Sequence, residues 1–108
     1  MEQEPIDLVV DHEQRDGLTL IRVRGELDLH TSAALRNEIE RMLPFRSPVT
    51  IDLAEVDFVD STGIRSLLTL NSQALESTGR ELRVQGASDV SRRLFALTGV
   101  DRVFTVVD

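Results

Sequence analysis

Asp60, Ser61, Thr62 and Gly63 lie where an apolar, strand-like segment (residues 49–59) meets a segment with helical periodicity. A serine at such a junction is predicted to be the N-cap of the helix. Its hydroxyl would then lie beside free backbone N–H groups at the positive end of the helix dipole. The same position suits a phosphate attached to that hydroxyl. Ser61 is therefore either a structural cap or a cap that is also a switch.

A hydrolytic triad of Ser61, His30 and Asp28 is the first enzymatic alternative. Asp28 and His30 are only two residues apart, which is an awkward spacing for an oriented carboxylate–imidazole pair. The chain also has no G-x-S-x-G elbow. The sequence therefore disfavours a hydrolase.

An acidic cluster for Mg²⁺ is the second alternative, formed by Asp28, Asp57 and Asp60. Asp52, late in a strand, superficially resembles the phosphoacceptor of a receiver domain. The chain contains no lysine, however, which argues against receiver, P-loop and Schiff-base chemistry. No glycine-rich nucleotide fingerprint surrounds Gly63. We therefore predict neither a metal nor a cofactor.

Composition bounds the remaining classes. The 108 residues are 41% hydrophobic, which fits one domain spanning residues 1–108. Cysteine is absent, so disulfides and thiolate sites are excluded. No apolar run approaches the ~20 residues that span a bilayer, and no signal peptide is evident. We expect a cytoplasmic, monomeric protein without membrane contact. The net charge of −7 argues against direct nucleic-acid binding.

Strands and helices are predicted to alternate along the chain. Asp16-Gly17 marks the turn of an N-terminal β-hairpin, and Gly79 and Gly99 are placed as helix ends. The strands are expected at 6–10, 18–24, 49–53 (extended to 59), 82–84 and 103–107, and the helices begin at Thr31, Ser61 and Ser88.

The third helix is predicted to bury Val90, Leu94 and Leu97. Phe95 lies off that face, so it is either exposed to a partner or an extension of the core. Phe58, next to the Ser61 junction, is the other aromatic residue of note.

The order β-β-α-β-α-β-α-β predicts an α/β fold with a mixed, mostly parallel sheet. Sites in such sheets gather where strand carboxyl ends meet helix N-termini. Asp28 and Ser61 both fall at positions of that kind.

Two segments together resemble the STAS family of anti-sigma factor antagonists: Gly25-Glu26-Leu27-Asp28, which leads into a helix, and residues 56–64, which contain Asp60-Ser61-Thr62-Gly63. The similarity covers essentially the whole chain. It implies a STAS-like domain that acts as a partner-switching regulator and not as an enzyme.

The resemblance also assigns roles to residues. It implies that Ser61 is phosphorylated by an anti-sigma factor that is itself a serine kinase, with Asp28 beside it in the fold. The unphosphorylated antagonist would capture the anti-sigma factor and free a sigma factor, and a serine phosphatase would reset the switch. Many members carry a small residue where this chain has Arg65, which leaves the choice of partner open. The alternative is a STAS-like subunit of a transporter or larger signalling assembly that senses a nucleotide or another small ligand.

Overall fold

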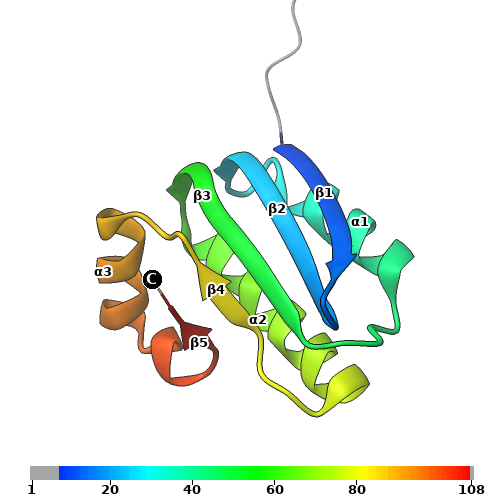
Figure 1. Ribbon diagram of the computed structural model, residues 1–108. Helices are drawn as coiled ribbons and strands as arrows, with labels where there is room; N and C mark the ends of the chain where they lie inside the picture. Colours follow the sequence, from blue (N-terminus) through cyan, green and yellow to red (C-terminus); the bar gives the residue numbers. More distant parts are fainter. Residues whose placement is uncertain (1–7, 108) are drawn as a thin grey trace, which may run out of the picture.

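The computed structural model describes residues 8–107. They form one five-stranded sheet in the order β1-β2-β3-β4-β5, with β1 antiparallel to β2 and the other neighbours parallel (Figure 1). The elements are β1 (Leu8–Arg15), β2 (Leu18–Leu27), α1 (Ser32–Met42), β3 (Val49–Val59), α2 (Ser61–Thr78), β4 (Arg83–Gln85), α3 (Asp89–Thr98), the short 3₁₀ helix η1 (Val100–Arg102) and β5 (Thr105–Val106). The predicted order and mixed sheet are confirmed, and η1 is an addition.

Helices α1 and α2 cover one face of the sheet, and α3 lies beside its β4–β5 edge (Figure 1). The core fills the space between the sheet and these helices. Ile21 and Ile51 from the central strands and Leu35 and Leu67 from α1 and α2 are fully buried there. Burial of these side chains supplies most of the driving force that holds α1 and α2 on the sheet.

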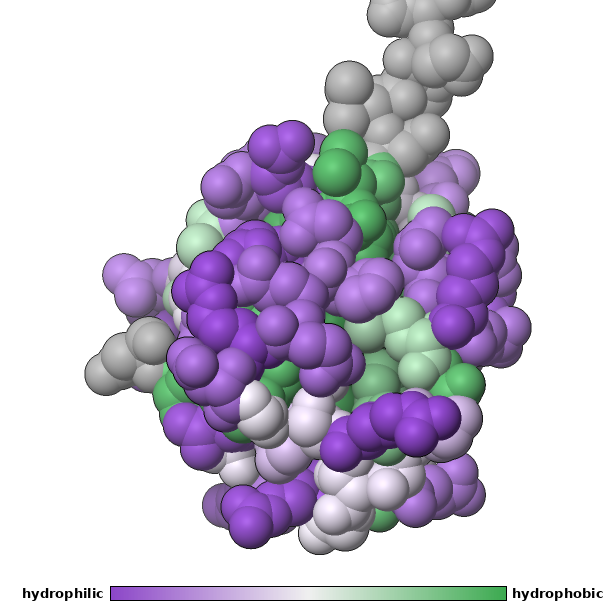
Figure 2. Space-filling view, turned by 45° about the vertical axis from the view of Figure 1, so that its right-hand side comes forward, coloured by the Kyte–Doolittle hydropathy of each residue, from purple (hydrophilic) through white to green (hydrophobic). Residues whose placement is uncertain are grey.

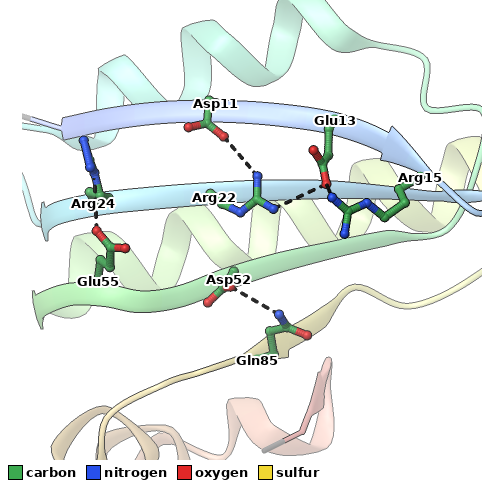
Figure 3. Close-up of polar contacts among 8 residues, drawn as sticks. All are labelled: Asp11, Glu13, Arg15, Arg22, Arg24, Asp52, Glu55 and Gln85. Atoms are coloured by element: carbon green, nitrogen blue, oxygen red, sulfur yellow. Dashed lines mark hydrogen bonds and ion pairs between the residues drawn. The ribbon is translucent and has the colours of Figure 1, made fainter.

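The opposite face of the sheet is polar (Figure 3). Arg22 lies between Asp11 and Glu13, with N–O distances of 3.6 and 3.3 Å, and Arg24 lies 3.4 Å from Glu55. Exposed pairs of this kind contribute about 0–1 kcal/mol each. They keep this face hydrated more than they stabilise the fold.

The N-terminal hairpin is confirmed, but its connection is shorter than predicted. We expected residues 11–17 to link the strands, whereas β1 continues to Arg15 and leaves only Asp16-Gly17 as the turn. Both turn residues have positive φ, 54° and 78°, as a two-residue hairpin requires. The polarity of residues 11–15 reflects an edge strand with an open face. Ile6, part of the predicted strand, lies outside the described residues.

Strand β2 continues past its predicted end at Arg24 to Leu27, and β3 is continuous from 49 to 59. Strand β3 carries two more residues than β2 over the paired stretch, because the register shifts twice along it. At each shift, the next buried residue of β3 follows three positions after the previous one instead of two. Strand β3 therefore buries Ile51, Leu53, Val56 and Val59. The two strands therefore end level with each other, with Leu27 opposite Val59.

Helix α3 faces the core differently from the prediction. It buries Ser91 and Phe95, whereas Val90 and Leu97 are each 78% exposed. The Phe95 ring packs edge-on against Phe104, with ring centroids 5.6 Å apart. Burying this large ring outweighs burying the smaller aliphatic groups, so Phe95 extends the core. The Ser88 cap is confirmed, since its hydroxyl accepts a hydrogen bond from the backbone N–H of Ser91.

Seen from the side of β1 and α1, the surface is mostly hydrophilic (Figure 2). An apolar strip lies at the start of β1, where Leu8, Val9 and Val10 border α1. Among the described helices, none combines the length and apolar character needed to cross a membrane.

Candidate phosphorylation and docking site

The candidate site lies at the end of the sheet where the carboxyl ends of β2 and β3 lie side by side. Leu27 and Val59 are register partners, and the backbone N–H of Asp60 donates to the carbonyl oxygen of Leu27 at 3.2 Å. The loop that leads into α1 and the start of α2 are therefore held together by main-chain contact. The parallel topology brings the Asp28 and Ser61 segments to one edge, as predicted.

Asp60, and not Ser61, is the N-cap of α2. Its backbone is extended (φ −108°, ψ −171°), and its Oδ1 accepts a hydrogen bond from the backbone N–H of Gly63 at 2.9 Å. The prediction that Ser61 caps the helix was wrong by one residue. Aspartate and serine are comparable caps, and Val59 is the last buried residue of β3, so Asp60 is the first residue free to take the role.

Ser61 is consequently the first residue of α2. It is exposed, and its hydroxyl has no hydrogen-bond partner among residues 8–107. A phosphate on this hydroxyl would therefore break no hydrogen bond of the described structure. It remains at the positive end of an 18-residue helix, where added negative charge is favourable.

Gly63 lies against the end of β2. A Cβ atom at this position would overlap the carbonyl oxygen of Leu27 and come within 3.0 Å of its Cγ. Gly63 itself is buried. Glycine is therefore required here for close approach, which fixes the start of α2 against the Leu27–Asp28 segment.

Asp28 organises the loop before α1. Its Oδ1 accepts hydrogen bonds from the backbone N–H groups of His30 and Thr31, at 2.9 and 3.1 Å. Thr31 occupies the N-cap position of α1, as predicted, but its side chain makes no capping bond. Its hydroxyl instead donates to the carbonyl oxygen of Glu26 at 2.6 Å. The carboxylate of Asp28 therefore closes the loop before α1 in an Asx-type turn and does not supply the capping bond expected of Thr31.

The geometry does not assemble the alternative sites. The Asp28 carboxylate accepts from the backbone of His30, and no bond between it and the imidazole occurs. Among residues 8–107, no group of three or more acidic or histidine side chains could hold a metal. Asp52 lies on the polar face of the sheet, where it accepts from the backbone of Ala54 and from Gln85 (Figure 3).

Thr62 and Arg65 turn towards α1. Both line a groove of about 100 Å³ between α1 and α2, together with Leu35, Arg36, Ile39, Ser66, Thr69 and Gln73. Thr62 is partly buried and Arg65 is exposed. The groove distinguishes the two adjacent hydroxyl residues, because Thr62 is part of its lining and Ser61 is not.

Two exposed apolar side chains flank the site. Phe58, near the end of β3, is 49% exposed, and Leu29, in the loop after β2, is 68% exposed. The sequence pattern singled out Phe58 but missed Leu29. Leu29 follows the polar Asp28 in a loop, so no periodic pattern signals its exposure. The end of the sheet that carries Ser61 thus also exposes two apolar side chains, which a docking protein could cover.

Three comparisons relate this geometry to known proteins. A family described as "Mlab, STAS domain" matches residues 10–108. The anti-sigma-B factor antagonist of Staphylococcus aureus is 32% identical over 99 residues, which cover 88% of each chain. The crystal structure of an anti-sigma factor antagonist from Mycobacterium paratuberculosis is 29% identical, with a TM-score of 0.80 over 92% of this chain and 84% of that one.

The fold is also shared with the Bacillus cell fate determinant SpoIIAA in its phosphorylated form. That structure has a TM-score of 0.66 at 20% identity and covers 93% of this chain and 92% of that one. The family match spans nearly the whole sequence, and the S. aureus relative agrees over most of it. The relatives from S. aureus and Paenibacillus polymyxa are named as anti-sigma factor antagonists, and the chain belongs to the STAS domain family.

Proposed function

We propose that this chain is an anti-sigma factor antagonist that acts by partner switching. In its unphosphorylated form it binds an anti-sigma factor that is also a serine kinase, and thereby releases a sigma factor. Phosphorylation of Ser61 ends this binding, and a serine phosphatase restores it. The observation that carries the proposal is the exposed hydroxyl of Ser61 at the start of α2, which has no hydrogen-bond partner among residues 8–107.

The relatives support this function over the alternative of a ligand-sensing transporter subunit. Those from S. aureus and Paenibacillus polymyxa are named as anti-sigma factor antagonists. SpoIIAA, which shares the fold, has been solved in unphosphorylated and phosphorylated forms. The proposal assigns the chain no catalytic step of its own, since the kinase and phosphatase supply the chemistry.

The switch acts on docking and leaves the fold intact. The N-terminus of α2 favours a dianion on Ser61 by about 0.3–1 kcal/mol, and the carboxylates of Asp28 and Asp60 at the same edge oppose it by a similar amount. Burying an unpaired charge beneath a partner is costlier, on the order of 2–5 kcal/mol. Affinity would fall by roughly thirty-fold to several thousand-fold.

The surface that docks comprises Ser61 and the exposed apolar side chains of Leu29 and Phe58. Asp28, Asp60, Thr62, Gly63 and Arg65 form its immediate environment. Asp60 and Gly63 set the position of the hydroxyl through the cap and the close approach to Leu27. Asp28 contributes to the kinase reaction and to partner contact from the neighbouring loop.

The decisive experiment incubates the purified chain with ATP and cytosolic extract of its host, or with the host's anti-sigma factors, and maps phosphate by mass spectrometry. We expect one phosphate on Ser61, no modification of Ser61→Ala, and normal modification of Thr62→Ala. Modification of Thr62 in the wild type would refute the assignment of Ser61. Loss of anti-sigma binding in the phosphorylated chain completes the test.

A further inference from the structure

Arg65 lies one helical turn after Ser61 within α2. Side chains four residues apart on a helix are neighbours, with Cβ atoms about 5–6 Å from each other. Both residues are exposed. The guanidinium of Arg65 can therefore reach a group attached to the Ser61 hydroxyl without any change in the backbone.

Arg65 is also uncommitted. The ion pairs within residues 8–107 engage Arg15, Arg22, Arg24 and Arg41. Arg65 and Arg36 have no acidic partner in this part of the chain. Arg46, Arg80, Arg83, Arg93 and Arg102 likewise form no ion pair within residues 8–107. Arg65 and Arg36 are therefore distinguished by their place beside the start of α2 and not by the lack of a partner.

These two arginines face one space. Arg36 from α1 and Arg65 from α2 line the same groove, whose lining includes the buried side chains of Leu35 and Ile39. Thr62, the residue after Ser61, lines it too. The groove thus opens beside the phosphorylation site and presents two positive charges next to an apolar surface.

We propose that Arg65, assisted by Arg36, is a built-in receptor for the phosphate on Ser61. This inference rests on the phosphorylation of Ser61 proposed above. A guanidinium binds phosphate through paired, charge-assisted hydrogen bonds. The phosphate is drawn towards the mouth of the α1–α2 groove, where the helix N-terminus and Arg65 act on it together.

Phosphorylation then changes the docking surface twice. It adds a dianion at Ser61, and it removes the free guanidinium of Arg65 from the surface offered to a partner. A partner selected for an acidic group opposite Arg65 would lose that contact when the phosphate takes its place. Arg65 is thus a specificity-determining residue of the switch, although it receives no phosphate itself.

The test uses the full chain with phosphoserine incorporated at position 61 during translation, so that no kinase is needed. The readout is the second pKa of the phosphate, followed by ³¹P NMR; this pKa lies near 6 in a free phosphoserine. A nearby guanidinium favours the dianion and lowers that pKa. We expect Arg65→Gln to raise the phosphate pKa by about 0.3 unit or more, and Arg36→Gln to raise it by less.

Arg80→Gln is the matched control, because Arg80 is exposed and follows the far end of α2. It should leave the phosphate pKa unchanged. If the phosphate pKa were the same in Arg65→Gln and Arg80→Gln, the proposal would be overturned. If Arg36→Gln left the phosphate pKa unchanged, Arg36 would have no part in binding the phosphate. Arg65→Lys should restore part of the shift, since it keeps the charge but loses the paired geometry.

The same experiment separates this inference from the proposed function. A pKa shift that depends on Arg65, in a chain that no host kinase modifies, would support the receptor and refute the switch. If the host kinase phosphorylated Ser61 but Arg65→Gln did not change the phosphate pKa, the switch would be supported and the receptor refuted.

Discussion

Gly63 packs so closely against Leu27 that the carbonyl oxygen of Leu27 occupies the space a side chain at position 63 would need. This contact joins the start of α2 to the end of β2, and the hydrogen bond from Asp60 to the same carbonyl strengthens the joint. The position of Ser61 relative to the Asp28 loop is consequently set by backbone atoms.

Gly63→Ala is expected to destabilise the domain, although the same change in an open helix stabilises it by about 0.5–1 kcal/mol. The added methyl group must displace main-chain atoms, at a cost of about 1–3 kcal/mol. Thermal unfolding measures the sign, with Ser72→Ala on the exposed side of α2 as the control. A melting temperature above that of the wild type would contradict the close approach.

The cap assignment predicts an order of stability for two adjacent alanine variants. Asp60→Ala removes the acceptor for the N–H of Gly63 and should cost about 0.5–2 kcal/mol. Ser61→Ala removes a hydroxyl without a partner in the described structure and should cost less than about 0.5 kcal/mol. Urea unfolding of both variants tests the order, and equal losses would mean that Ser61 shares the capping role.

For Asp28, substitutions separate its loop hydrogen bonds from its charge. Asp28→Asn keeps a side-chain oxygen for the N–H groups of His30 and Thr31, so stability should change by about 0.5 kcal/mol or less. Asp28→Ala removes the acceptor and should cost about 0.5–2 kcal/mol. The kinase rate or partner affinity of Asp28→Asn should nevertheless change. Normal phosphorylation and binding by that variant would exclude a role for the charge.

How much the sequence predicted depended on how local each signal was. The order of elements, the hairpin and the helix ends at Gly79 and Gly99 rest on turn and cap residues, whose preferences act within a few positions. These were confirmed. The start of α2 at Ser61 was also confirmed, but its N-cap is Asp60 and not Ser61. Asp60 and Ser61 are both good caps, and only the end of β3 decides between them.

The features that the sequence did not predict, or predicted wrongly, depend on tertiary packing. Two register shifts against β2 move the buried positions of β3 to every third residue, which simple alternation does not predict. Helix α3 orients towards Phe104 through Phe95, a partner nine residues away that periodicity within α3 cannot reveal. The α1–α2 groove likewise combines Arg36 with Arg65, and only the packing of α1 against α2 brings these side chains together.

The apolar groups beside Ser61 should matter for docking and little for folding. Phe58→Ser removes a half-exposed ring, and Leu29→Ser removes a largely exposed side chain. Each should weaken binding of the anti-sigma factor, by about 1 kcal/mol or more for a true anchor. The matched control is Leu75→Ser, 41% exposed near the far end of α2. If the control weakened binding as much, docking would extend well beyond this edge.

Two substitutions at Ser61 test the switch itself. Ser61→Asp places a carboxylate in the first turn of α2, where the helix dipole favours it by about 0.3–1 kcal/mol, so it should be at least as stable as Ser61→Ala. Binding should show the reverse order. Ser61→Ala leaves the docking surface uncharged, so it should bind the anti-sigma factor like the wild type and escape inactivation by the kinase. The carboxylate of Ser61→Asp carries less charge and fewer acceptor atoms than phosphate, so its loss of affinity should be partial.

Thermal unfolding and calorimetric titration of the two variants measure both orders. Equal affinities would mean that charge at Ser61 does not control docking, and a ligand-sensing role for the domain would then be favoured.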